Sequence, residues 1–214
     1  MNSAAQRQRA VGIILAGGRS SRMGVEKSLV ELEGRPLLQW GIDRFGEQVC
    51  ALAINANGDG GRFSAFDLPV IADPMGGHMG PLAGILAGMM WARKHHSSVS
   101  HIASIASDTP FFPTDFVERL EVRLEGEEDR ICIPSSANGL HPAFGLWPVV
   151  LAGQLESWLL SGGRRVQSWL REQQAVSVDF PLNKRKGGQI DPFFNINAPA
   201  DLQIAVDWCA QYSG

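Results

Sequence analysis

Short apolar runs alternate with longer amphipathic stretches along most of the chain. The run Val11–Leu15 holds five mostly apolar residues, which is too short for a helix and typical of a buried strand. Comparable runs predict further strands at Val49–Ile54, Leu68–Ala72, His101–Ser107, Arg130–Pro134, Gly139–Trp147 and Ala175–Phe180. Helices are predicted between them at Pro36–Phe45, Pro81–Arg93, Pro113–Leu124, Val149–Leu160, Arg164–Glu172 and Ala200–Gln211. Asn183–Gly188 is expected to be a basic loop, and Pro192–Asn197 a last extended segment.

This alternation predicts an α/β fold: a three-layer α/β/α sandwich around a mostly parallel, Rossmann-like sheet. A length of 214 residues suits one such domain. Residues 1–10 are polar and are expected to be a disordered tail, which leaves residues 11–214 as a single folded domain.

The most informative stretch follows the first predicted strand, where Ala16–Gly18 forms a turn with almost no side chain. Such a turn lets backbone N–H groups approach an anion closely. Arg19, Arg22 and Lys27 then place three cations within nine residues, against one carboxylate, Glu26, in a chain whose net charge is −3. A bound polyphosphate accounts for this concentration of positive charge. The alternative is an ordinary strand-to-loop connection followed by a solvated basic loop.

Two well-known phosphate loops do not fit this turn. A Walker A loop requires Gly-Lys-Ser/Thr in its second half, whereas Gly24 is followed by Val25 and Glu26. The dinucleotide fingerprint requires Gly-x-Gly-x-x-Gly, and the tripeptide Gly17-Gly18-Arg19 breaks it. The turn is therefore a third kind of loop.

Three polar side chains follow predicted strands and are candidates for the same ligand: Asn55, Asp73 and Asp108. In a parallel sheet the carboxyl ends of the strands meet at the edge that receives ligands. Asp108 follows a strand that is expected to be central, where a divalent ion on a triphosphate would lie. The alternative for Asp108 is a turn cap before Thr-Pro, and for Asn55 and Asp73 a turn residue that caps its own backbone.

The stretch LAGGRSSRMGVEKSLVELEGRPLLQW resembles the signature of nucleotidyltransferases that handle molybdopterin, most closely the molybdenum cofactor guanylyltransferase (MobA) family. Glu26 departs from the motif, because the family usually has aspartate there. The resemblance continues through the pair His141-Pro142, the stretch GGRRV at 162–166 and the stretch NINAPADL at 195–202, so it spans about residue 11 to about residue 204.

The resemblance implies a fold similar to that of nucleotide-diphospho-sugar transferases and a defined reaction. GMP is transferred from GTP to molybdenum-loaded molybdopterin, which forms the guanine dinucleotide cofactor and releases pyrophosphate. The nucleophile is already an anion, so the protein has to align two anions and neutralise the leaving pyrophosphate. The implied metal is Mg²⁺, and oxygen ligands suit Mn²⁺ as well.

By position in the family motifs, the resemblance also assigns roles to individual residues. The residues expected to contact GTP are Leu15, Ala16, Gly17, Lys27, Asn55, Asp73 and Asp108. Arg22, Lys27 and Asp108 are expected to be catalytic, with Asp108 as the metal ligand. His141, Asn195 and Asn197 are candidates for the molybdopterin side, and loop-structuring roles are the alternative for these three.

The choice of base depends on one position. Relatives that transfer a cytidylyl group usually read LAAG where this chain reads LAGG, so the methyl group missing at Gly17 leaves space for a purine. GTP is therefore predicted over CTP. The alternatives are a molybdopterin cytidylyltransferase, a sugar-phosphate nucleotidyltransferase of the same fold or, more distantly, a non-catalytic nucleotide-binding protein.

Composition adds constraints on location and partners. A pI near 5.9 argues against a nucleic-acid-binding surface. No apolar stretch is long enough for a membrane span, and the three widely spaced cysteines suggest reduced thiols in a cytoplasmic protein. Besides GTP and molybdopterin, the resemblance implies contacts with other cofactor-biosynthesis proteins and with apo-molybdoenzymes.

Overall fold

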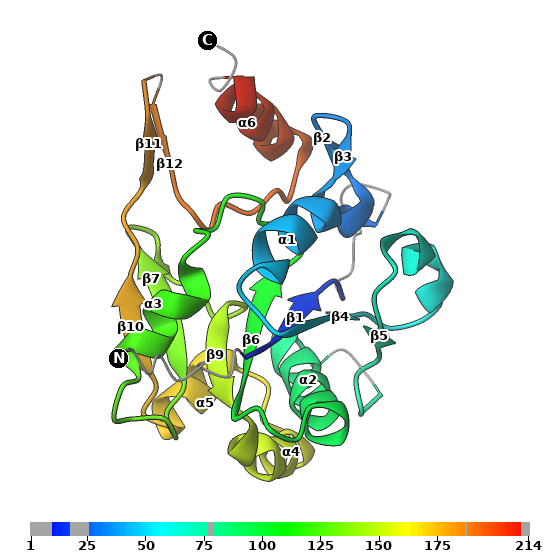
Figure 1. Ribbon diagram of the computed structural model, residues 1–214, viewed down its shortest axis with the longest axis vertical. Coiled ribbons are helices and arrows are strands. Elements are labelled where there is room, and N and C mark those ends of the chain that lie inside the picture. Colours follow the sequence, from blue (N-terminus) through cyan, green and yellow to red (C-terminus); the bar gives the residue numbers. More distant parts are fainter. Residues whose placement is uncertain (1–9, 18–25, 77–78, 187, 211–214) are drawn as a thin grey trace, which may run out of the picture.

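The computed structural model describes residues 10–17, 26–76, 79–186 and 188–210. The central sheet is built from β1 (Val11–Leu15), β4 (Ala51–Asn55), β5 (Val70–Ile71), β6 (His101–Ala106), β7 (Cys132–Ser136), β8 (Gly139–Leu140), β9 (Gly145–Pro148) and β10 (Val176–Asp179). Its strand order is β10-β7-β9-β6-β1-β4-β5 (Figure 1). The short strand β8 pairs with β7. Neighbouring strands are parallel except where β9 meets β6 and β7 and where β8 meets β7, which confirms the mostly parallel sheet.

Helices cover both faces of this sheet, as the three-layer prediction required (Figure 1). They are α1 (Leu37–Gly46), α2 (Pro81–His95), α3 (Phe116–Arg123), α4 (Ala152–Leu160), α5 (Val166–Glu172) and α6 (Pro199–Ala210). Short 3-10 helices are η1 (Lys27–Leu29), η2 (Gly60–Phe66) and η3 (Val149–Leu151). Two small hairpins lie outside the sheet: β2 (Glu31–Leu32) with β3 (Arg35–Pro36), and β11 (Asn183–Arg185) with β12 (Gly188–Ile190).

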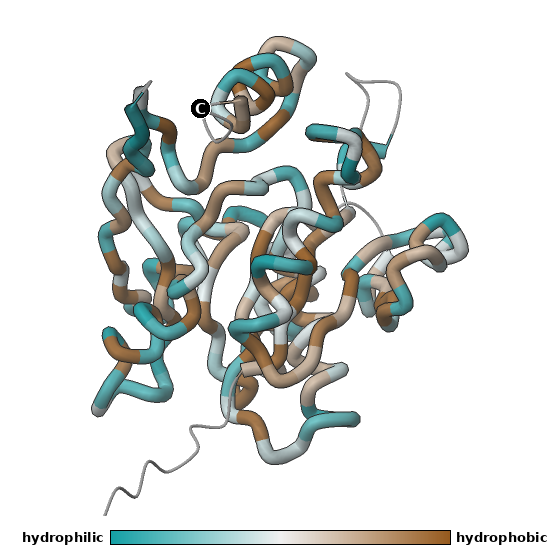
Figure 2. Tube along the Cα trace, turned by 45° about the horizontal axis from the view of Figure 1, so that its top comes forward, coloured by the Kyte–Doolittle hydropathy of each residue, from teal (hydrophilic) through white to brown (hydrophobic). Residues whose placement is uncertain are grey.

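The apolar run of β1 is explained by its place between β4 and β6, with both faces buried. Side chains of consecutive strand residues point to opposite faces. Ile14 therefore joins the core under α1 and α3, while Ile13 joins the core under α2, α4 and α5. In Figure 2 the hydrophobic segments accordingly gather inside the fold, and the hydrophilic ones follow the loops and the β11–β12 hairpin.

Helix α2 lies close to the sheet because two of its residues lack a side chain. A Cβ atom on Gly88 would lie 2.5 Å from Cγ1 of Ile13, and one on Gly84 would lie 2.2 Å from Oδ1 of Asn55. Real Cβ atoms do not approach other atoms this closely. The glycines are therefore packing residues of α2, and Gly84 also leaves room for a residue of the predicted site.

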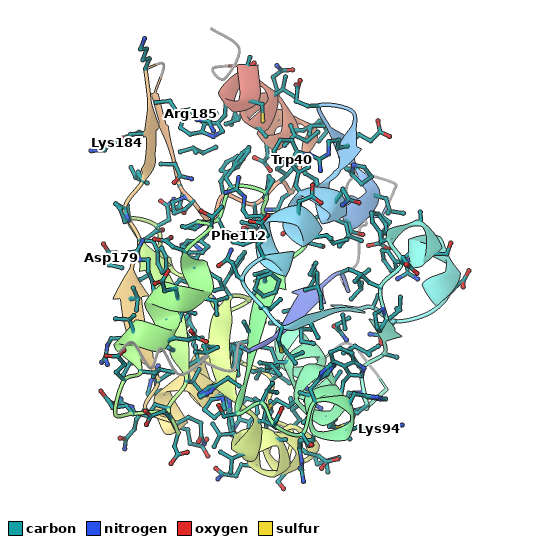
Figure 3. All side chains as sticks on the ribbon, in the orientation of Figure 1. Trp40, Lys94, Phe112, Asp179, Lys184 and Arg185 are labelled. Carbon is teal, nitrogen blue, oxygen red and sulfur yellow. The ribbon has the colours of Figure 1, made fainter. Side chains whose placement is uncertain are left out.

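Two predicted elements were wrong. The strand predicted for Gly139–Trp147 is split into β8 and β9 by a turn in which the amide of Phe144 donates to the carbonyl of His141 at 2.9 Å. The basic loop predicted for Asn183–Gly188 is the β11–β12 hairpin. In Figure 3 Arg185 points from this hairpin towards α6, where its guanidinium lies 4.2 Å from the Trp208 ring, while Lys184 points away.

Further aromatic packing fixes α1 and α3 on their face of the sheet. Phe112, central in Figure 3, makes edge contacts with Phe45 of α1 and Phe116 of α3, with ring centroids 6.1 Å apart in each pair. Of the three cysteines, Cys132 and Cys209 are buried, and Cys50 is exposed. Across the described parts of the chain, no helix combines the length and the apolar character needed to cross a bilayer.

Packing at Gly88 generates a stability prediction. Gly88→Ala would force the new methyl group into Ile13, and overpacking of this kind costs about 1–3 kcal/mol. We expect a corresponding fall in the free energy of unfolding measured with urea. Gly153→Ala in α4 is the matched control, since a Cβ there meets nothing within 4 Å and alanine favours helix by about 0.5–1 kcal/mol. Equal losses in both variants would contradict the close approach of α2.

Candidate active site

The glycine turn begins at a fixed point of the sheet. The carbonyl of Leu15, the last residue of β1, accepts a hydrogen bond from the amide of Ser107 at 3.2 Å. The amide of Ala16 donates to the carbonyl of Asn55 at 2.9 Å. These bonds continue the pairing with β6 and β4 one residue beyond the strand. The position of the turn is therefore set by its two neighbouring strands.

A cleft of about 930 Å³ lies at this carboxyl edge of the sheet. It is lined by every residue predicted to contact GTP, and also by residues that include Glu26, Asn57, Arg62, Met75, Met79, Ala143 and Asn195. His141 and Asn197 do not line it. Arg22 lies outside the described residues, as do the other residues of the signature from Gly18 to Val25.

One wall of the cleft carries a network of side-chain amides around Asp73. Nδ2 of Asn55 donates to Oδ1 of Asp73 at 2.9 Å, and Nδ2 of Asn57 donates to Oδ2 at 2.7 Å. Asn57 also accepts from the Asp73 amide at 2.9 Å, so the carboxylate is held in one orientation. Asn55 and Asp73 were predicted from the sequence, whereas Asn57, two residues beyond Asn55 in the same strand-end segment, was not.

The opposite wall holds Asp108, two residues after the end of β6. Its side chain is 16% exposed, and its Oδ2 lies 3.7 Å from Nζ of Lys27. Burial raises the pKa of Asp108, and the nearby Lys27 ammonium offsets this only in part. The carboxylate is therefore held with less solvation than it has in water, an arrangement that favours the binding of a cation.

Lys27 and Asp108 are tied to a segment near the carboxyl terminus. Nζ of Lys27 donates to Oδ1 of Asn197 at 2.5 Å. Oγ1 of Thr109 donates to Oδ1 of Asn195 at 3.0 Å, and the amide of Ile196 donates to the carbonyl of Asp108 at 2.9 Å. Both asparagines predicted for the acceptor side thus lie beside Lys27 and Asp108.

His141 belongs to a separate polar network that the sequence analysis missed. Its centre is the buried carboxylate of Asp191, which accepts from Oγ of Ser136 at 2.5 Å and from Nδ2 of Asn138 at 2.7 Å. Nε2 of His141 lies 2.7 Å from Oγ of Ser136, and its ring stacks on Phe193 with centroids 4.5 Å apart. Burial lowers the pKa of His141, and Asp191 offsets this in part.

Glu26, the departure from the family motif, has a partner across the cleft. Its Oε2 lies 3.5 Å from Nε of Arg62, which belongs to η2. Both side chains are about one quarter exposed, at 25% and 26%. The pair links the segment after the glycine turn to η2, and the additional methylene group of glutamate extends its reach towards Arg62. Arg62 was not predicted from the sequence, because nothing in its local sequence distinguishes it from an ordinary surface arginine.

The side chains available as ligands indicate how a metal ion would be held. Among the described residues no group of three or more histidine, cysteine or carboxylate side chains is placed to hold an ion. Asp108 provides a single carboxylate at the edge of the cleft. Mg²⁺ is commonly bound by one or two carboxylates together with substrate phosphates and water. The residues fit an ion that arrives with a triphosphate.

Comparisons with known proteins agree with this geometry. A sequence model described as the MobA-like NTP transferase domain matches residues 12–176. A curated molybdenum cofactor guanylyltransferase from Rhizobium rhizogenes is 45% identical over 199 residues, which cover 92% of this chain and 91% of that protein. The crystal structure of molybdopterin-guanine dinucleotide biosynthesis protein A from Archaeoglobus fulgidus has a TM-score of 0.70 at 25% identity, covering 94% of this chain and 99% of that one.

A manganese complex of a Mycobacterium tuberculosis protein shares the fold, with a TM-score of 0.63 at 15% identity over 93% of this chain and 98% of that one. The fold and the cleft define a nucleotidyltransferase with the sheet of the nucleotide-diphospho-sugar transferases. Within that class, the chain belongs to the MobA-like NTP transferase family.

Asp108 also generates a prediction about pH. Burial raises the pKa of Asp108, so the folded protein binds a proton on this carboxyl group more tightly than the unfolded chain does. The stability that this proton binding contributes is lost as the pH rises through the raised pKa. Asp108→Asn removes the buried charge. Without divalent ions, we expect the variant to melt at a higher temperature than the parent at neutral pH. The difference should shrink as the pH falls towards about 4, the ordinary range of a carboxyl group. A lower melting temperature at neutral pH would contradict this.

Proposed function

We propose that this protein transfers GMP from GTP to molybdenum-loaded molybdopterin, forming the guanine dinucleotide cofactor and releasing pyrophosphate. The observation that carries the proposal is that the glycine turn, Lys27 and Asp108 line one cleft of suitable size. The similarity to molybdenum cofactor guanylyltransferases over nine tenths of the chain supports the choice of substrates. We also propose that residues 11–214 act as one nucleotidyltransferase domain, in the cytoplasm.

In the proposed reaction a terminal phosphate oxygen of molybdopterin attacks the α-phosphorus of GTP. The new P–O bond forms as the bond between the α- and β-phosphates breaks, and pyrophosphate leaves with the electron pair. No side chain has to be activated as a nucleophile, so positioning and charge neutralisation provide the catalysis. The backbone amide of Gly17 would bind phosphate oxygens, and Lys27 would neutralise charge on the phosphates. We assign a similar role to Arg22 from its place in the signature.

We further propose that Asp108 holds a divalent ion, Mg²⁺ or Mn²⁺, that is shared with the phosphates. Such an ion would withdraw charge from the reacting phosphate and the leaving group. The low solvation of Asp108 and its position beside Lys27 support this role. The Asn55–Asp73 wall would bind the nucleoside, and the acceptor would lie towards Asn195 and His141.

A direct assay tests the reaction. The protein is incubated with Mg-GTP and molybdenum-loaded molybdopterin, and the guanine dinucleotide is identified by mass. We expect Asp108→Ala to abolish metal-dependent pyrophosphate release, because the ion would lose its protein ligand. The control is Asp115→Ala, which removes an exposed carboxylate that does not line the cleft. A parent protein that binds GTP without forming product would instead support a non-catalytic role.

Gly17 generates a prediction about base choice. A Cβ on Gly17 would meet only Oδ1 of Asn55, at 4.0 Å. The new methyl group would therefore extend into the space left for the ligand and would not collide with the protein. We expect Gly17→Ala to lower the preference for GTP over CTP in kcat/KM by about ten- to two-hundredfold, the usual range for one methyl group in a pocket. A parent protein that prefers CTP at equal concentrations would overturn the guanylyl assignment.

A further inference from the structure

Asn197 lies in the carboxyl-terminal half of the chain, where the family resemblance implies contacts with the acceptor. Its side chain nevertheless does not line the cleft. It accepts a hydrogen bond at 2.5 Å from Nζ of Lys27, a residue 170 positions earlier in the chain. The same ammonium lies 3.7 Å from Oδ2 of Asp108. The lysine is therefore held between an amide oxygen and a carboxylate that come from different parts of the fold.

The backbone around Asn197 is held on both sides. On one side the amide of Ile196 donates to the carbonyl of Asp108 at 2.9 Å. On the other side Oδ2 of Asp201, in the first turn of α6, accepts from the amides of Asn197 and Ala198 at 2.8 and 2.9 Å. The Asn197 side chain thus projects from a backbone whose position is fixed relative to both Asp108 and α6.

The same segment is anchored further upstream. Asp191 is 6% exposed, and its Oδ1 accepts from the amide of Phe193 at 2.7 Å while its Oδ2 is bound to β7 through Ser136. Phe193 is buried in the aromatic cluster with Phe116. Residues 191–197 therefore cross the carboxyl edge of the sheet from β7 to Lys27 with fixed contacts along the way.

A lysine side chain has four rotatable bonds, and an ammonium that must meet a phosphate loses affinity if it first has to be ordered. An amide oxygen suits this task, because it accepts from the ammonium without neutralising its charge. We propose that Asn197 is a positioning residue for Lys27, which fixes the ammonium for the nucleotide phosphates, and that it does not bind the acceptor. The inference rests on the proposed function only in taking GTP as the nucleotide.

A double-mutant cycle tests the role of Asn197. The dissociation constant of Mg-GTP is measured by calorimetry without acceptor for the parent, Asn197→Ala, Lys27→Ala and the double variant. We expect Asn197→Ala to weaken GTP binding roughly tenfold, the size of one hydrogen bond to a charged group. In the Lys27→Ala background the same change should shift the constant by less than about twofold, since coupled residues are not additive. The KM for molybdopterin should stay within about twofold of the parent value.

Asn183→Ala is the matched control, because it removes another asparagine hydrogen bond, to the carbonyl of Phe111, outside the cleft. Its GTP affinity should equal that of the parent. An unchanged GTP affinity in Asn197→Ala, or an equal loss with and without Lys27, would overturn the proposal, as would a rise confined to the KM for molybdopterin. A parent protein that does not bind GTP would overturn the proposed function itself, so the two failures are distinguishable.

Discussion

The site depends on the Asp108 carboxylate, which is mostly buried and whose charge the nearby Lys27 ammonium offsets only in part. Asp108 is 16% exposed, and its nearest cation, Lys27, lies at 3.7 Å, beyond direct hydrogen-bond distance from Oδ2. Burial consequently outweighs the lysine in setting its pKa. A protein that holds a charge in this way loses stability, and the loss is recovered when a cation with its own phosphate ligands binds.

The sheet makes this arrangement possible because it fixes the ends of three neighbouring strands. β1 lies between β4 and β6, and hydrogen bonds from Leu15 to Ser107 and from Ala16 to Asn55 fix the start of the glycine turn. The two walls of the cleft are the continuations of β4 and β6. Helix α2 can approach these strand ends because Gly84 has no side chain to meet Asn55. Core packing and the geometry of the cleft are therefore determined by the same few positions.

Much of the fold, and the site residues at the strand ends, were predictable from local sequence patterns. Buried strands followed at once by Asn55 and Asp108 were identified because parallel strands end at a common edge. Contacts between distant segments were not predictable in this way. Arg62 and Asp191 acquire their roles from Glu26 and Ser136, which lie far from them in the sequence, and neither has a local signature. The β11–β12 hairpin was mistaken for a loop because its Arg185 is held by Trp208, 23 residues later.

The family comparisons and the geometry are complementary. Sequence similarity identifies the MobA-like family, whereas the structure shows which side chains meet: Lys27 with Asn197 and Asp108, and Glu26 with Arg62. The most direct test of the account is a crystal structure with Mn²⁺ and a non-hydrolysable GTP analogue, recorded at the manganese absorption edge. We expect an anomalous peak bonded to the Asp108 carboxylate, with the phosphates against residues 15–17. A peak bonded elsewhere, with the turn unoccupied, would contradict it.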